Sequence, residues 1–177
     1  GIADDMWAKF DPEIMTNLQY VPEQIMTPGG FGIPFLLTPY GIMYNPDKVE
    51  KPTSWLDLFK PEYKGQIALS GDPTGSGQAI NSVWAAALAN GGSLDNAEPG
   101  LQFFKQLNDM GNLLPVIAKP ATIAQGETPI TLRWDYNALA NRDETAGNPE
   151  IAIVIPKSGT LAGVYVQAIS AYAPRPH

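Results

Sequence analysis

Cysteine is absent from the 177-residue sequence, and histidine occurs once, as the last residue, His177. Without cysteine the chain can form neither disulfides nor thiolate metal sites, and it has no Cys nucleophile. A single His at the end of the chain is a poor basis for a Ser-His-Asp triad or a His-ligated zinc site. We therefore expect a binding function, with no catalytic residue, no bound metal and no cofactor.

Basic residues are few and scattered: 11 Lys and Arg stand against 18 Asp and Glu, which gives a net charge of −7. Nucleic-acid binding and polybasic membrane contact both need clustered Lys and Arg, so the sequence argues against both. Long apolar runs are also lacking, whereas a membrane-spanning helix needs about 20 apolar residues. Hydrophobic residues still make up 44% of the chain, which is enough for a core and excludes intrinsic disorder.

The hydrophobic pattern predicts strands that alternate with helices. The predicted strands are residues 31–38, 41–44, 66–70, 129–134, 151–155 and 163–170. The main predicted helices are residues 78–90, 97–110 and 136–142, with short ones after Asp11, after Ser54 and at 121–125. This alternation predicts an α/β fold with a mainly parallel sheet, in which 66–70, 129–134 and 151–155 are neighbouring strands.

Local signals refine three of these elements. Pro39 and Tyr40 predict a sharp bend between the first two strands. Ser54, with Asp57 three positions later, predicts a capping box at a helix start. The helical spacing within 97–110 predicts four side chains that face the core: Leu101, Phe103, Phe104 and Leu107.

Three segments are similar to a known family. Residues 40–49 read Tyr-Gly-Ile-Met-Tyr-Asn-Pro-Asp-Lys-Val, residues 52–58 read Pro-Thr-Ser-Trp-Leu-Asp-Leu, and residues 63–69 read Tyr-Lys-Gly-Gln-Ile-Ala-Leu. In this order and spacing they resemble the extracellular solute-binding proteins of ABC importers, in the branch that includes ferric-iron, polyamine, thiamine and phosphonate binders. The resemblance implies a periplasmic-binding-protein-like lobe, a small-molecule solute, a membrane permease as partner, and a periplasmic or extracellular location.

The resemblance also implies how the chain is divided. Residues 1–40 would be a partial first-lobe and hinge segment, 41–163 the second α/β lobe, and 164–177 a return hinge strand with a truncated tail. Because part of the first lobe and a C-terminal set of helices would be missing, we interpret the sequence as a fragment. Solutes of this family lie between two lobes, so we expect weak binding or none, and the exposed hinge strands would allow the fragment to dimerise.

The loop Thr74, Gly75, Ser76, Gly77, with Gln78 after it, follows a predicted strand and begins a predicted helix. Unpaired amides at a helix start favour an anion, and the two hydroxyl groups add donors. The loop lacks the Lys of a Walker A motif and the third Gly of a dinucleotide fingerprint, so we do not expect a nucleotide. The alternative is structural: Thr74 or Ser76 caps the helix, and the glycines permit a tight turn.

Trp134, Asp135 and Tyr136 lie where a predicted strand ends and a helix begins, which is where ligands bind in open α/β sheets. A carboxylate beside two aromatic rings suits an ammonium group. In the alternative interpretation Trp134 belongs to the core, Asp135 caps the helix, and Arg133 is a solvated charge. The resemblance implies ligand contacts at this junction.

Thr38 and Tyr40 on one crossing between the lobes, and Tyr165 on the other, complete the candidate site, with packed structural tyrosines as the alternative. For a ferric-iron binder the resemblance implies adjacent tyrosines as ligands, and no Tyr-Tyr pair is present, which argues against ferric iron. A small organic anion or zwitterion, such as a phosphonate, is the favoured solute. A polyamine-type solute and a carboxylate-based hydrolase that uses Asp72 and Asp135 remain alternatives.

Overall fold

The computed structural model describes residues 5–174, so His177 lies outside the described residues. The chain divides into two compact units: unit 1 comprises Gly1–Thr38 and Gly163–His177, and unit 2 comprises Pro39–Ala162. Strands β2 (Ile33–Tyr44) and β7 (Ala162–Gln167) each contain residues of both units, and they pair with each other. The expected division into the lobe segments 1–40, 41–163 and 164–177 stays a prediction.

Unit 2 contains the main sheet, with the strand order β4-β3-β5-β2-β6. Its further strands are β3 (Ile67–Leu69), β4 (Leu113–Ile117), β5 (Ile130–Trp134) and β6 (Ala152–Val154). Strand β3 runs parallel to β4 and β5, whereas β2 runs antiparallel to β5 and β6. The α/β class is confirmed, and the sheet is mixed because β2 is inserted between β5 and β6. Strands β3 and β5 are neighbours, as predicted. The prediction that residues 151–155 (β6) lie next to them is wrong, because β2 lies between β5 and β6.

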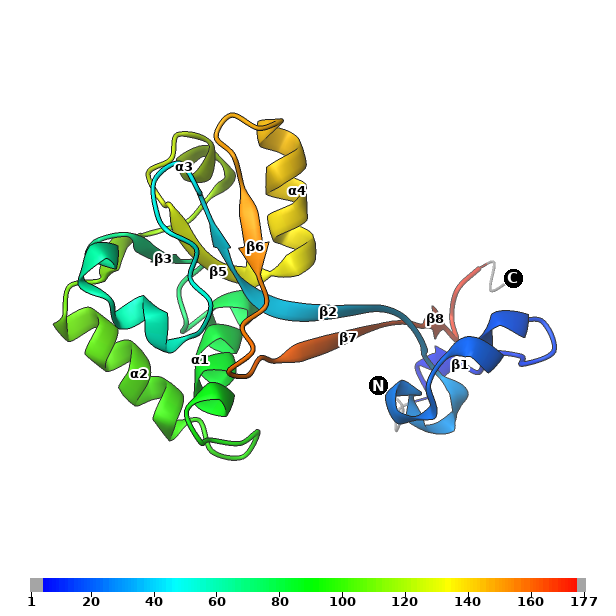
Figure 1. Ribbon diagram of the computed structural model, residues 1–177. Coiled ribbons are helices and arrows are strands. Elements are labelled where there is room, and N and C mark those ends of the chain that lie inside the picture. The colour runs from blue at the N-terminus through cyan, green and yellow to red at the C-terminus, as the bar shows by residue number, and fades with distance from the viewer. Residues whose placement is uncertain (1–4, 175–177) are drawn as a thin grey trace. The chain divides into compact units, whose positions relative to one another are not determined.

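Four helices cover the two faces of this sheet, namely α1 (Gly77–Ala89), α2 (Glu98–Asp109), α3 (Pro120–Ala124) and α4 (Asp135–Thr145). Figure 1 shows α1 and α2 on one side of the sheet and α3 and α4 on the other. The core follows the same division, because alternate residues of a strand point to opposite faces. Ile130, Leu132 and Trp134 pack with residues of α1 and α2, whereas Met43 and Ala68 pack with residues of α3 and α4.

Helices α1 and α2 pack closely at Gly100. A Cβ atom at this position would lie 2.0 Å from the carbonyl oxygen of Val83, so the contact requires a glycine. Phe103 and Leu107 of α2 are buried, as predicted, whereas Leu101 is 50% exposed, so its predicted inward position is wrong. The reason is angular: Leu101 lies two positions before Phe103, about 200° around a helix with 3.6 residues per turn.

The predicted bend at Pro39 and Tyr40 is wrong, because β2 is one continuous strand of 12 residues. The φ angle that proline imposes is compatible with an extended strand. Hydrogen bonds to the segment before β7 follow directly after Pro39. The amide of Tyr40 donates to the carbonyl oxygen of Leu161 at 2.8 Å, and the Thr160 hydroxyl donates to the carbonyl oxygen of Tyr40.

Unit 1 contains a two-stranded antiparallel sheet of β1 (Trp7–Ala8) and β8 (Ile169–Ser170). Three short 3-10 helices complete it, namely η2 (Thr16–Tyr20), η3 (Glu23–Ile25) and η4 (Pro28–Gly30). The helix predicted after Asp11 is wrong. Instead, Asp11 forms a single turn: its carbonyl oxygen accepts the amides of Ile14 and Met15 at 3.2 and 3.0 Å, and its carboxylate accepts the amide of Glu13 at 2.8 Å.

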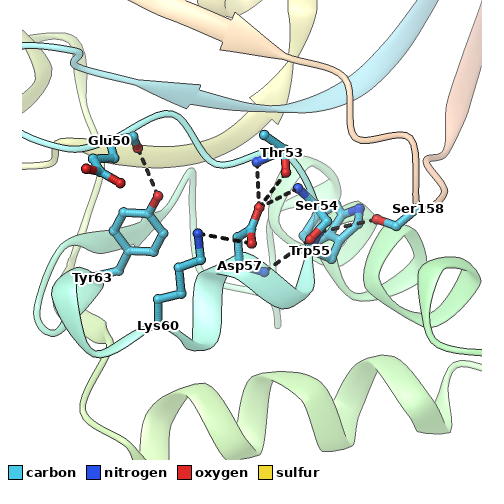
Figure 2. A network of polar contacts seen from close by, with 8 residues as sticks. All are labelled: Glu50, Thr53, Ser54, Trp55, Asp57, Lys60, Tyr63 and Ser158. Atoms are coloured by element: carbon cyan, nitrogen blue, oxygen red, sulfur yellow. Dashed lines mark hydrogen bonds and ion pairs between the residues drawn. The ribbon is translucent and has the colours of Figure 1, made fainter.

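The predicted capping box is present in unit 2 (Figure 2). The Asp57 carboxylate accepts the amides of Thr53 and Ser54 at 2.8 and 3.0 Å, and the Ser54 hydroxyl accepts the Asp57 amide at 3.3 Å. The helix that follows is a 3-10 helix, η5 (Leu56–Phe59). Partial burial would raise the pKa of Asp57, but the hydrogen bonds from Thr53, Ser54 and Lys60 outweigh it and hold this pKa well below its usual range.

Trp55 links this turn to the segment that precedes β7. Its ring is fully buried, and its indole N–H donates to the carbonyl oxygen of Gly159 at 3.0 Å. Its backbone amide donates to the hydroxyl of Ser158 at 3.3 Å, and its ring packs edge-on against Phe103 at 5.9 Å between centroids. The return segment is thus fixed to the core of unit 2 before it continues into β7 (Figure 2).

Candidate functional site

The candidate residues of unit 2 meet where the parallel strands β3 and β5 end. Leu69 of β3 is paired with Leu132 of β5, so both strands end at the same edge of the sheet. Helix α1 begins at Gly77, shortly after β3, and α4 begins at Asp135, directly after β5. We call residues 70–78 and 134–137 the carboxyl edge. Such an edge is the usual position of ligands in open α/β sheets.

In the loop before α1, Asp72 accepts four hydrogen bonds from Thr74, Gly75 and Ser76. The Asp72 Oδ1 accepts the amide of Thr74 at 2.8 Å and its hydroxyl at 2.6 Å. The Asp72 carbonyl oxygen accepts the amides of Gly75 and Ser76 at 3.0 and 2.7 Å. The Ser76 hydroxyl accepts the amide of Ala79 at 3.3 Å, as in the structural alternative for this residue. In this arrangement Thr74 donates to a protein carboxylate, whereas in the anion hypothesis Thr74 or Ser76 donates to a solute.

Gly71 makes this turn possible. Its φ angle is +145°, and a Cβ atom here would lie 2.3 Å from the hydroxyl oxygen of Ser76. A side chain would therefore displace the residue that caps α1. The hydrogen bonds from Thr74 also lower the pKa of Asp72, so this exposed carboxylate is ionised at neutral pH.

Tyr40, Gln78 and Trp134 form a packed cluster beneath the edge. Tyr40 is fully buried, and its hydroxyl lies 2.7 Å from the carbonyl oxygen of Gln78 and 2.9 Å from that of Leu132. Its ring meets that of Trp134 edge-on, with 5.1 Å between centroids. The Gln78 Oε1 accepts the amide of Trp134 at 3.3 Å and the side-chain amide of Asn137 at 3.2 Å. Burial raises the pKa of Tyr40 well above its ordinary value, as expected of a packed, structural tyrosine.

Asp135 and Tyr136 extend from this cluster to the surface. Trp134 is only 7% exposed and belongs to the core, whereas Asp135 is half-buried and Tyr136 is 37% exposed. The Asp135 Oδ1 accepts the amide of Tyr136 at 2.7 Å. The carboxyl edge thus offers a carboxylate and an accessible aromatic ring next to each other in the sequence.

Arg133 supports the edge from within and is not the solvated charge that the alternative interpretation assumed. It is 7% exposed; its Nε donates to the Ser70 hydroxyl at 3.2 Å and its Nη1 to the side-chain oxygen of Asn141. The Ser70 hydroxyl in turn donates to the carbonyl oxygen of Leu132 at 2.8 Å. Burial lowers the pKa of Arg133. The supporting role of Ser70 and Arg133 was not predicted from the sequence. A strand that is covered on both faces buries both of its alternating sets of side chains, and this indicates a buried Arg133.

Thr38 and Tyr165 belong to unit 1, unlike the other candidates. Thr38 is fully buried on β2, and Tyr165 is partly exposed on β7. Their contact with a solute, like that of Thr74, Gly75, Ser76, Gly77 and Gln78, stays a prediction.

Within residues 5–174, no three His, Cys, Asp or Glu side chains lie close enough together to hold a metal ion. In the same part of the chain, no helix is long and apolar enough to cross a membrane.

Comparison with known sequences identifies relatives over the whole described chain. The family model described as "Bacterial extracellular solute-binding protein" matches residues 2–174. The spermidine/putrescine-binding periplasmic protein of Escherichia coli K12 is 30% identical over 183 residues, and that of Salmonella typhimurium is 27% identical. Each alignment covers 96% of this chain but 50% of the relative, so the chain spans about half the length of these curated relatives.

Solved structures show the same fold. An ABC transporter protein from Clostridium perfringens has a TM-score of 0.72 at 25% identity and covers 98% of this chain and 55% of its own. The spermidine/putrescine-binding protein PotD of Streptococcus pneumoniae has a TM-score of 0.73 at 21% identity, covering 96% and 53%. Iron-bound HitA of Pseudomonas aeruginosa has a TM-score of 0.68 at 21% identity, covering 99% and 56%. The resemblance seen in the sequence is confirmed, and the chain belongs to the bacterial extracellular solute-binding protein family.

Proposed function

We propose that the carboxyl edge of this chain forms part of the solute site of an ABC importer's binding protein, and that the solute is a small cationic amine. The complete protein would capture this amine in the periplasm or outside the cell and deliver it to a membrane permease. The proposal adopts the polyamine-type alternative in place of the organic anion that the sequence pattern favoured.

The observation that carries the proposal is the state of the loop before α1. Its Thr74 donors, which the anion hypothesis offered to a solute, instead bind the carboxylate of Asp72. Among its charged and aromatic groups, the edge carries the exposed carboxylate of Asp72, the half-buried carboxylate of Asp135 and the exposed ring of Tyr136. An ammonium group forms charge-assisted hydrogen bonds with carboxylates and is attracted to the face of an aromatic ring. The net charge of −7 adds a long-range attraction for cations.

The relatives support the same class of solute. The curated relatives with up to 30% identity are named for spermidine and putrescine. The structural neighbours at lower identity support the fold alone, since they include both PotD and an iron-bound protein. The choice between solutes therefore depends on the chemistry of the carboxyl edge.

The test is an NMR titration of the chain with putrescine, spermidine, phosphate and methylphosphonate, because NMR detects weak binding. We expect shifts with the two amines at residues of the carboxyl edge. Asp72→Asn and Asp135→Asn should each weaken putrescine binding about tenfold or more, since each removes the negative charge that strengthens the hydrogen bond to the ammonium group. Asp109→Asn is the matched control, because Asp109 lies on α2 and pairs with Lys105. Tighter binding of methylphosphonate than of putrescine would overturn the proposal.

Dimerisation through the hinge strands also stays a prediction. Phe35 and Leu37 of β2 and Val166 of β7 are exposed apolar side chains that a second copy could cover. Light scattering during size-exclusion chromatography gives the mass in solution, and a monomer at high concentration would contradict this prediction.

A further inference from the structure

A hollow of about 330 Å³ lies beside Asp72, on the side of the edge strand β4. It is bounded by Leu69, Gly71, Asp72, Pro73 and the whole of β4, Leu113–Ile117. Apart from the carboxylate, every side chain in this set is apolar; Leu113 and Leu114 pack against the two cores, whereas Val116 and Ile117 are 46% and 44% exposed. Its volume falls at the lower end of the range for small-molecule sites. We call this hollow the β4 groove.

The carboxylate at the rim of the β4 groove is held in place but has acceptor capacity left. Both donors of Thr74 bind to one oxygen, Oδ1. Within the described chain, no hydrogen bond is formed to the other oxygen, Oδ2. A fixed carboxylate with one open oxygen is a preorganised acceptor for an ammonium group, since little conformational entropy remains to be lost on binding.

We propose that the β4 groove binds the aliphatic chain of a primary amine whose ammonium group is held by Asp72 Oδ2. This inference rests on the proposed function and narrows it to amines that carry several consecutive methylene groups. Charge complementarity selects the occupant: the carboxylate repels an alkyl anion, and a neutral alcohol forms no ion pair with it. The apolar lining favours methylene groups over a second polar group close to the first.

The length of the alkyl chain provides the test. The probes are propylamine, pentylamine and heptylamine, with pentanol and pentanoate as the matched neutral and anionic compounds. Each methylene that leaves water tightens binding up to about fourfold. We therefore expect the affinity to rise from propylamine to heptylamine, with shifts of the Val116 and Ile117 methyl signals and none of the exposed Leu101 methyls on α2.

Two variants separate the two parts of the proposal. Val116→Ser changes an exposed side chain, so the fold should be retained, and it should flatten the dependence on chain length. Asp72→Asn should weaken all amines and leave that dependence in place. Leu101→Ser, on α2, is the control and should change neither.

The possible failures are distinguishable. If amines bind with no dependence on chain length, or without shifts at Val116 and Ile117, the β4 groove is refuted while the proposed amine function stands. If pentanoate or pentanol binds as well as pentylamine, ion pairing with Asp72 is refuted. If no amine binds but phosphate or methylphosphonate does, the proposed function falls and the groove assignment falls with it.

Discussion

Substitution of Gly100 by alanine tests the packing of α1 on α2, on which the start of α1 at the carboxyl edge depends. The new Cβ atom would lie 2.0 Å from the Val83 carbonyl oxygen and 3.0 Å from the Ala87 nitrogen, both of them backbone atoms that cannot rotate away. Such contacts in folded proteins are at least about 3 Å, so the helices must separate by about 1 Å. A gap of that size removes between a quarter and a half of the attraction across the contact.

The expected cost follows from two opposing effects. Overpacking of this kind costs about 1–3 kcal/mol or more, and alanine recovers up to about 1 kcal/mol through its higher helix propensity. Because the new Cβ atom clashes with backbone atoms of α1, we expect the upper end of the overpacking cost and a net loss of about 2 kcal/mol of unfolding free energy. With a urea m-value of about 2 kcal/mol/M, the unfolding midpoint should fall by about 1 M.

Urea unfolding followed by tryptophan fluorescence measures this loss, because Trp55, Trp84 and Trp134 all lie in unit 2. Gly77→Ala is the matched control: it makes the same change in α1, where a Cβ atom would meet nothing within 4 Å. We expect this control to leave the midpoint unchanged or to raise it slightly. Equal midpoints for Gly100→Ala and the unchanged protein would refute the close contact between the helices.

Two further substitutions test single contacts. Asp57→Asn should cost about 1–2 kcal/mol at neutral pH through loss of the charged cap. The pKa of Asp57 is lower in the folded than in the unfolded chain, so its contribution to stability is complete above about pH 4 and declines as the pH falls further. The unfolding free energy measured from pH 7 to pH 3 should therefore fall more steeply for the unchanged protein than for Asp57→Asn. Parallel curves for the two proteins would contradict this. Tyr40→Phe should cost about 1 kcal/mol, since the hydroxyl that bridges the carbonyl oxygens of Gln78 and Leu132 is lost; an unchanged urea midpoint would show that this bridge contributes nothing.

Most of the elements could be predicted from the sequence, because their signals are local. The apolar runs and the glycines that end helices placed β3, β5, α1 and α2 within a few residues of their observed bounds. The position of β2 in the sheet could not be predicted in this way. Its pairing with β5 and β6 depends on residues about a hundred positions further along the chain, and nothing in residues 33–44 specifies those partners. The continuity of β2 through Pro39 likewise depends on the hydrogen bond from Tyr40 to Leu161.

For the candidate site, sequence reasoning found the segments but not the state of their groups. It identified the loop at 74–78 and the junction at 134–136, and the structure places both at the carboxyl edge. It could not show that the Thr74 donors are satisfied by Asp72, because a side chain two positions away can either bind its neighbours or face solvent. The same limit applies to Arg133, whose partners Ser70 and Asn141 come from other elements.

The central position of β2 also has a consequence for how unit 2 acquires its fold. Contacts that close the sheet join residues 92 to 120 positions apart, such as Tyr40 with Leu132, Trp55 with Gly159, and Thr160 with Tyr40. During synthesis, β2 is made before its partners β5 and β6, so it stays unpaired until those strands have been made. Such long-range pairing is slow and leaves an unpaired edge exposed in the meantime. The nascent chain of unit 2 consequently needs protection from aggregation until residue 160 has left the ribosome.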